Sequence, residues 1–248
     1  MGERVNFGET YGDAWDTYIK RYHEGIEPKI GMWPGDQWGR EADWRLIFDE
    51  LILAHVPIGA RRFLEIGPGS GKYTAMLLDA YPEATIRAVD VSAAYLDVLR
   101  ERLAGPVAVG RVVPDLVDAD HGGLLRRLRT VDWVDRVDCV CAFDSLVHVD
   151  LQYMMGYLLT AAEVLRIGGV LAIMVADATS AAGFEKLVRD VRRVWPFQGR
   201  ICQKFEWVGP DILANILSRL GFEERLHRSH GATLHVVASL REHVKLSW

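Results

Sequence analysis

Phe63-Leu64-Glu65-Ile66-Gly67-Pro68-Gly69-Ser70-Gly71 is the stretch of sequence that decides the fold. Its first half is mostly apolar and predicts a strand buried on both faces, and the residues after it carry a helical pattern. Glycines between a strand and a helix permit positive φ and let the backbone approach a ligand closely. The stretch therefore predicts a binding turn at the carboxyl end of a buried strand.

Strand and helix patterns alternate beyond this turn. Strands are expected over residues 61–66, 85–90, 107–113, 137–143, 170–176, 222–228 and 232–240. Ser92 and Asp150 are expected to cap the helices after two of these strands, and Gly168-Gly169 to end the second helix, which runs towards Leu165. The alternation predicts a Rossmann-like α/β fold with a mostly parallel sheet and helices on both faces. Residues 229–231 are too short a connection for a helical crossover, so the last two strands should be antiparallel.

The first 55 residues differ in composition from the rest of the chain. They hold Trp15, Trp33, Trp38 and Trp44 among the eight tryptophans, and three of the eight tyrosines. Aromatic side chains at this density are not left in water. We therefore expect residues 1–55 to form a helical extension, or lid, over a domain of residues 56–248. Some of these aromatics should fill the core, and others should wall a pocket at the carboxyl ends of the strands.

Two phosphate-binding interpretations of the glycine turn fit the residues poorly. A P-loop has glycine at the position of Ile66 and serine or threonine at the position of Tyr73, so we reject it. A dinucleotide site has the pattern Gly-x-Gly-x-x-Gly, and the spacing here is one residue shorter. Glu65 at the strand tip would also repel a pyrophosphate. The dinucleotide interpretation remains an alternative.

S-adenosylmethionine is a third ligand, and it has no phosphate. Its methionine end carries an ammonium and a carboxylate, and its sulfur is cationic. An acid such as Glu65 then becomes favourable, and the amides of the turn are expected to receive the carboxylate. Asp90, at the end of the second strand, can accept hydrogen bonds from both ribose hydroxyls. Asp90 suits a dinucleotide equally well, so Glu65 is the residue that favours S-adenosylmethionine.

The sequence resembles the class I S-adenosylmethionine-dependent methyltransferases over roughly residues 60 to 240. The resemblance rests on four ordered stretches: the turn with its flanks (residues 63–74), Ala88-Val89-Asp90-Val91-Ser92, the apolar run at residues 137–143 and the segment at residues 163–171. It implies a seven-stranded sheet with an antiparallel last strand. It also implies that S-adenosylmethionine is the cofactor, held by Glu65, Gly67, Gly69 and Asp90, with Val91 packed on the adenosine.

Other candidate cofactor residues flank these positions. They are Pro68 and Gly71 in the turn, and Phe143 and Asp144 at the end of the fourth strand. The family often has an Asp-Ala pair near the adenine. Here Asp115-Leu116 lies nearest the end of the third strand and is preferred, whereas Asp118-Ala119 looks more like the motif.

Three further residues are candidates for the reaction itself or for the methionine end. His148 follows the fourth strand and is the candidate general base for a hydroxyl or amine acceptor, because its ordinary pKa lies near working pH; capping the next helix is its alternative role. Arg40 could pair with the methionine carboxylate, and Trp38 could cover the sulfonium through cation–π attraction. No clustering of histidines suggests a metal site, and no metal is expected.

The net charge of −5 gives no reason to expect a nucleic-acid partner. No signal peptide and no membrane-spanning stretch is expected, so the predicted location is cytoplasmic. The predicted activity is methyl transfer to a small molecule, such as a sugar or secondary metabolite, at oxygen or nitrogen. RNA or protein methylation and a non-catalytic cofactor-binding module are the alternatives, and a homodimer is left open.

Overall fold

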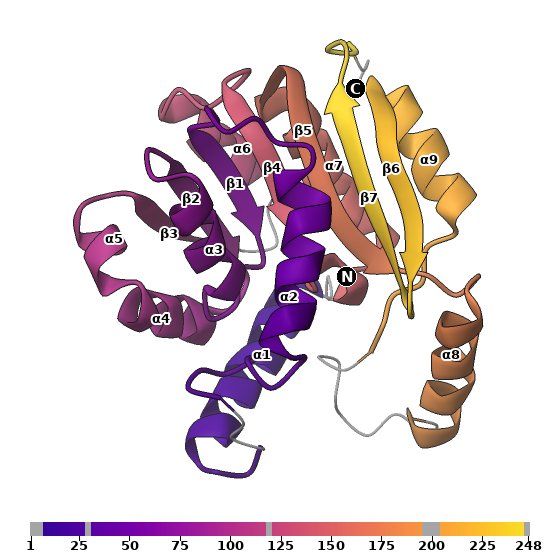
Figure 1. The fold of residues 1–248 in the computed structure, drawn as a ribbon. Coiled ribbons are helices and arrows are strands. Elements are labelled where there is room, and N and C mark those ends of the chain that lie inside the picture. The colour runs from indigo at the N-terminus through magenta and orange to yellow at the C-terminus, as the bar shows by residue number, and fades with distance from the viewer. Residues whose placement is uncertain (1–6, 28–30, 118–120, 195–203, 246–248) are drawn as a thin grey trace, which may run out of the picture.

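The structure is a computed structural model that describes residues 7–27, 31–117, 121–194 and 204–245. Its centre is a seven-stranded sheet in the order β3-β2-β1-β4-β5-β7-β6 (Figure 1). The strands are β1 (Arg62–Ile66), β2 (Thr85–Asp90), β3 (Val112–Leu116), β4 (Val137–Ala142), β5 (Leu165–Ala176), β6 (Phe222–His230) and β7 (Thr233–Leu240). Neighbours from β3 to β5 pair in parallel, and β7 is antiparallel to both β5 and β6. The predicted Rossmann-like sheet with an antiparallel last strand is confirmed.

Helices cover both faces of this sheet, as predicted. One face packs against α6 (His121–Thr130), α7 (Leu151–Val164) and α9 (Pro210–Arg219) through residues such as Leu128, Met154 and Leu213. The other face packs against α3 (Lys72–Ala80), α4 (Ala93–Arg102) and the π-helix η1 (Asp49–Leu53) through residues such as Leu77 and Leu51. Burial on both sides is the reason why the strands read as nearly continuous apolar runs.

The N-terminal extension divides into two parts with different surroundings. α2 (Glu41–Phe48) runs into η1, and Phe48, Leu51 and Ile52 are buried in the core of the sheet domain. α1 (Phe7–His23) instead packs on α4, and it lies at the edge where the parallel strands end (Figure 1). Of these two helices, α1 therefore has the position of a lid, and the lid function stays a prediction.

Two predicted boundaries were wrong. The strand expected at residues 107–113 begins at Val112, because residues 104–108 form the short helix α5 (Ala104–Ala108) and Gly110 then turns with φ of 72°. Gly168-Gly169 does not end α7, which stops at Val164. The pair lies inside β5, where the register against β4 shifts. Glycines are typical of such bulges, and a Cβ on Gly169 would lie 2.8 Å from the Arg166 carbonyl oxygen.

The remaining helices are α8 (Ala181–Val194) and the 3-10 turn η2 (Leu146–His148) directly after β4. η2 matters most for the site, because it follows the strand that borders the glycine turn across the sheet. Within the described ranges, none of the helices combines the length and the apolar character needed to cross a membrane.

Candidate functional site

A pocket opens where β1, β2 and β4 end, at the point where the strand order reverses. Open α/β sheets bind ligands at this position. The hollow measures about 1060 Å³ including its open mouth. It is lined by Tyr11, Trp15, Pro34, Gly35, Trp38, Ile66, Gly67, Pro68, Gly69, Ser70, Lys72, Tyr73, Val89, Asp90, Val91, Tyr95, Phe143, Asp144, Ser145, Leu146, His148, Val149, Tyr153 and Tyr157.

The glycine turn has the conformation that its composition predicts. Gly67, Gly69 and Gly71 have φ of 65°, 54° and 83°, and a Cβ on Gly67 would lie 2.4 Å from the Ser145 Cβ. Their amides, however, are already hydrogen-bonded within the protein. Gly67 donates to Val89 (2.8 Å), Gly69 to the Asp90 carboxylate (3.2 Å) and Gly71 to Pro68 (2.9 Å). A ligand carboxylate therefore needs a partner other than these three amides.

Asp90 lies at the end of β2, on the wall of the pocket, and is only 7% exposed. Its carboxylate accepts hydrogen bonds from the Gly69 amide and, at 2.9 Å, from the Ser92 amide. Burial raises the pKa of Asp90 to about 6, against the lowering effect of these amides. Asp90 is therefore mostly ionised at neutral pH, and two backbone amides hold its carboxylate in place.

Glu65 lies beneath the turn rather than on the pocket wall. It is 1% exposed, and its carboxylate accepts a hydrogen bond of 2.6 Å from the Thr74 hydroxyl on α3. Burial raises the pKa of Glu65 to about 7, and the neighbouring Asp90 adds to the effect. The structure thus assigns Glu65 a contact that joins β1 to α3.

Glu65→Gln is expected to stabilise the fold above pH 7 by about 1–2 kcal/mol. Between about pH 4.5 and 7, Glu65 keeps its proton in the folded state but has lost it in the unfolded state, because its pKa is raised by folding. The stability of the wild type therefore falls as pH rises through this range. Glutamine keeps the Thr74 contact without the buried charge, although its extra amide protons offset part of the gain. Urea unfolding at pH 4.5 and pH 8 measures the difference, and Glu163→Gln, an exposed acid paired with Arg129, is the matched control. An equal effect at both pH values would contradict the assignment.

Asp144 and His148 follow β4 and face the pocket together. Asp144 has φ of 52°, a strained value for a residue other than glycine, and such strain concentrates at functional sites. Nδ1 of His148 donates to the Lys204 carbonyl oxygen at 2.8 Å, since a carbonyl only accepts. The neutral ring therefore has its lone pair on Nε2. Burial lowers the pKa of His148, and the nearby Asp144 carboxylate opposes this shift.

Lys72, the first residue of α3, is a site residue that the sequence did not reveal. Its ammonium lies 3.8 Å from the centre of the Trp44 ring and 3.5 Å from the Gly35 carbonyl oxygen. Within the described part of the chain, no carboxylate forms an ion pair with it. Burial lowers its pKa to about 8, against the opposing effect of Asp144. A cation in this position suits an anionic group of a ligand.

Several predicted site residues lie off the pocket wall. The side chain of Arg40 is 83% exposed and pairs with Asp43, and the Asp115 carboxylate pairs with Arg87. Gly71 and Leu116 are also absent from the wall, and Asp118-Ala119 falls outside the described residues.

Other predicted site residues do lie on the wall. Trp38 lines the pocket, and the centre of its ring lies 5.2 Å from that of Tyr18. The predicted Gly67, Pro68, Gly69, Asp90, Val91, Phe143, Asp144 and His148 are all on the wall.

Aromatic residues from two helices complete the pocket. Tyr11 and Trp15 come from α1, and Tyr153 and Tyr157 from the start of α7. The Tyr11 and Tyr153 rings meet edge to face at 6.4 Å. Spacings of four residues within each pair put both members on one helix face. The four-residue spacing can be seen in the sequence and predicts that each pair shares a helix face. It does not predict that this face lies over the pocket.

Comparison with known proteins agrees with this geometry. Residues 64–171 match the family model described as a methyltransferase domain. The trans-aconitate 2-methyltransferase of Methylobacterium nodulans is 29% identical over 170 residues, which cover 68% of this chain and 59% of that relative. The enzyme of the same name from Rhodopseudomonas palustris (strain BisB5) is 38% identical over 72 residues, covering 29% and 28%. The chain thus matches less than two thirds of the length of these relatives.

Solved structures share the fold at low sequence identity. The magnesium protoporphyrin IX methyltransferase of Synechocystis has a TM-score of 0.63 at 14% identity, covering 94% of this chain and 99% of that one. The geranyl diphosphate C-methyltransferase of Streptomyces coelicolor has a TM-score of 0.62 at 11% identity, covering 93% and 98%. The glycine turn with its two acids, the sheet order and the matching family model agree. Residues 64–171 thus match a methyltransferase domain, and the fold around them is one that solved methyltransferases share.

Proposed function

We propose that this protein transfers a methyl group from S-adenosylmethionine to a small molecule. The observation that carries the proposal is a single pocket that joins Asp90 and the glycine turn to an aromatic compartment containing His148. S-adenosylmethionine would supply an electrophilic methyl group. Asp90 would hold the ribose, and the aromatic side chains would exclude water and orient the acceptor, because alignment of the reacting atoms contributes much of the rate of such a displacement.

The cover over the pocket favours a small acceptor over RNA or protein. Tyr11 and Trp15 of α1 form part of the wall, and the ring of Trp15 lies 5.3 Å from that of His148. A macromolecule would have to displace this helix to bring a nucleophile beside His148. Two of the similar relatives are named for trans-aconitate, so small carboxylic acids belong in the first acceptor panel, together with sugars and phenols.

Isothermal titration with S-adenosylmethionine and S-adenosylhomocysteine tests the cofactor, and NADH serves as the comparison ligand. Release of S-adenosylhomocysteine with each acceptor of the panel tests the reaction. Binding without turnover on any acceptor would favour a non-catalytic module. RNA binding that weakens steeply with salt would favour the RNA alternative. If the protein bound neither S-adenosylmethionine nor S-adenosylhomocysteine, the proposal would be overturned.

Lys72→Met is expected to lower the affinity for S-adenosylhomocysteine about tenfold, the effect of losing one charge-assisted hydrogen bond. The three glycine amides are occupied, and the Lys72 ammonium on the pocket wall would instead receive the carboxylate of the amino-acid end. The matched ligand is 5′-methylthioadenosine, which lacks that end and should bind both proteins equally. Equal losses for the two ligands would show that Lys72 supports the pocket without contacting the carboxylate.

A further inference from the structure

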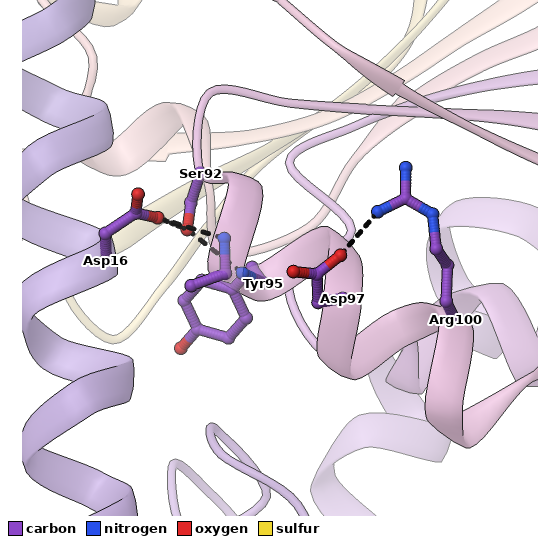
Figure 2. A network of polar contacts seen from close by, with 6 residues as sticks. Asp16, Ser92, Tyr95, Asp97 and Arg100 are labelled. Atoms are coloured by element: carbon purple, nitrogen blue, oxygen red, sulfur yellow. Dashed lines mark hydrogen bonds and ion pairs between the residues drawn. The ribbon is translucent and has the colours of Figure 1, made fainter.

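Helix α1 is tied to the sheet domain through Asp16. One oxygen of the Asp16 carboxylate accepts hydrogen bonds from the Ser92 hydroxyl at 2.5 Å and from the Ala94 amide at 3.1 Å (Figure 2). Ser92 is the N-cap of α4, and its hydroxyl also accepts from the Tyr95 amide at 3.1 Å. A carboxylate at a helix N-terminus is stabilised by the unpaired amides and the helix dipole there. The contact of Asp16 with α4 is therefore expected to be stronger than an ordinary surface hydrogen bond.

Ser92 also contacts Asp90. Its amide donates to the Asp90 carboxylate at 2.9 Å, while its hydroxyl donates to Asp16. Ser92 is completely buried. A single buried residue therefore bridges the carboxylate on α1 and the carboxylate at the end of β2.

A second contact seats α1 on the same segment. Gly12 lies against the Val91 carbonyl, and a Cβ at this position would lie 2.5 Å from its oxygen. Such an approach is open to glycine alone. Gly12 and Asp16 are four residues apart and thus share a helix face. Residues 91–94, which directly follow Asp90, are held by this face at both contacts.

We propose that Asp16 is a positioning residue that couples the docking of α1 to cofactor binding, through Ser92 and Asp90. The inference rests on the proposed function, in which Asp90 binds the cofactor ribose. Asp16 itself is not among the residues that line the pocket. Thermodynamic linkage makes the effect reciprocal. A ligand bound to Asp90 stabilises the docked position of α1, and a change that destabilises this docking makes the free energy of ligand binding less favourable by the same amount.

Asp16→Ala is expected to lower the affinity for both adenosine and S-adenosylhomocysteine by about five- to twentyfold, the lower part of the usual range for coupling between sites. Both ligands carry the ribose, whereas the loss in Lys72→Met is confined to ligands with the amino-acid end. In wild type, S-adenosylhomocysteine should slow hydrogen exchange of the amides in α1, and this protection should be lost in Asp16→Ala. Asp97→Ala is the matched control, because Asp97 lies on α4, the helix that Asp16 contacts, pairs with Arg100 and is exposed (Figure 2).

Gly12→Ala is the second variant, and it displaces α1 from Val91 while leaving Asp16 in place. It should reproduce the loss of affinity and of protection, with a cooperative thermal unfolding transition confirming that the sheet domain is folded. Wild-type affinity and unchanged α1 protection in both variants would overturn the coupling while leaving the proposed function intact. Failure of the wild type itself to bind S-adenosylhomocysteine would instead overturn the proposed function and the coupling with it.

Discussion

Asp90→Ala is expected to lower the affinity for S-adenosylhomocysteine by at least roughly 100-fold. Two ribose hydroxyls donating to a buried carboxylate contribute about 1.5–3 kcal/mol each. The substitution also leaves the Gly69 and Ser92 amides without their acceptor, which loosens the turn. Isothermal titration of wild type and variant at pH 7.5 measures the effect.

The ligand 2′,3′-dideoxyadenosine separates the ribose contact from a general loss of structure. It lacks both hydroxyls, so wild type should bind it about as weakly as Asp90→Ala binds adenosine, and the substitution should change its affinity little. Because the pKa of Asp90 is raised to about 6, protonation should weaken adenosine binding as pH falls below that value. A variant that loses adenosine and the dideoxy ligand equally would show that the turn has collapsed, and the ribose assignment would fail.

The glycine turn and Asp90 could be predicted because their chemistry is local. A strand, three glycines and a helix within residues 63–74 allow few conformations, and an acid at the end of the neighbouring parallel strand must lie beside the turn. The same reasoning placed Asp144 and His148 beside the pocket, since β4 borders β1. Their positions at the ends of strands, within the sheet that the resemblance implies, were sufficient for these residues.

Side chains that depend on long-range packing could not be predicted in this way. The assignment of Arg40 to the pocket assumed an orientation, and the side chain instead pairs with Asp43 on the surface. Lys72 was not predicted as a site residue, because its approach to Trp44 joins two segments far apart in the sequence. The position of α1 depends on Gly12, which fits against the Val91 carbonyl. Helical periodicity does not predict this contact.

His148→Asn is expected to lower kcat at least roughly 100-fold with a hydroxyl or amine acceptor, which is the usual contribution of a general base. Asparagine can still donate to the Lys204 carbonyl oxygen in place of Nδ1, but it has no basic nitrogen in place of Nε2. The affinity for S-adenosylhomocysteine should stay the same, since the lost function is proton transfer. His227→Asn is the matched control, because that histidine lies on β6, away from the pocket, and pairs with Glu224.

The pH profile gives an independent test of the same nitrogen. Burial lowers the pKa of His148 below its ordinary value of 6.5, so the ring is neutral and able to accept a proton at pH 7. Wild-type kcat should therefore hold its plateau down past pH 6.5 and fall only as the ring becomes protonated, whereas the variant should lack this fall. If kcat is unchanged in His148→Asn, the acceptor reacts as an anion that has already lost its proton, as a carboxylate does. In that case His148 orients the acceptor through its contacts with Trp15 and Phe205 and takes up no proton.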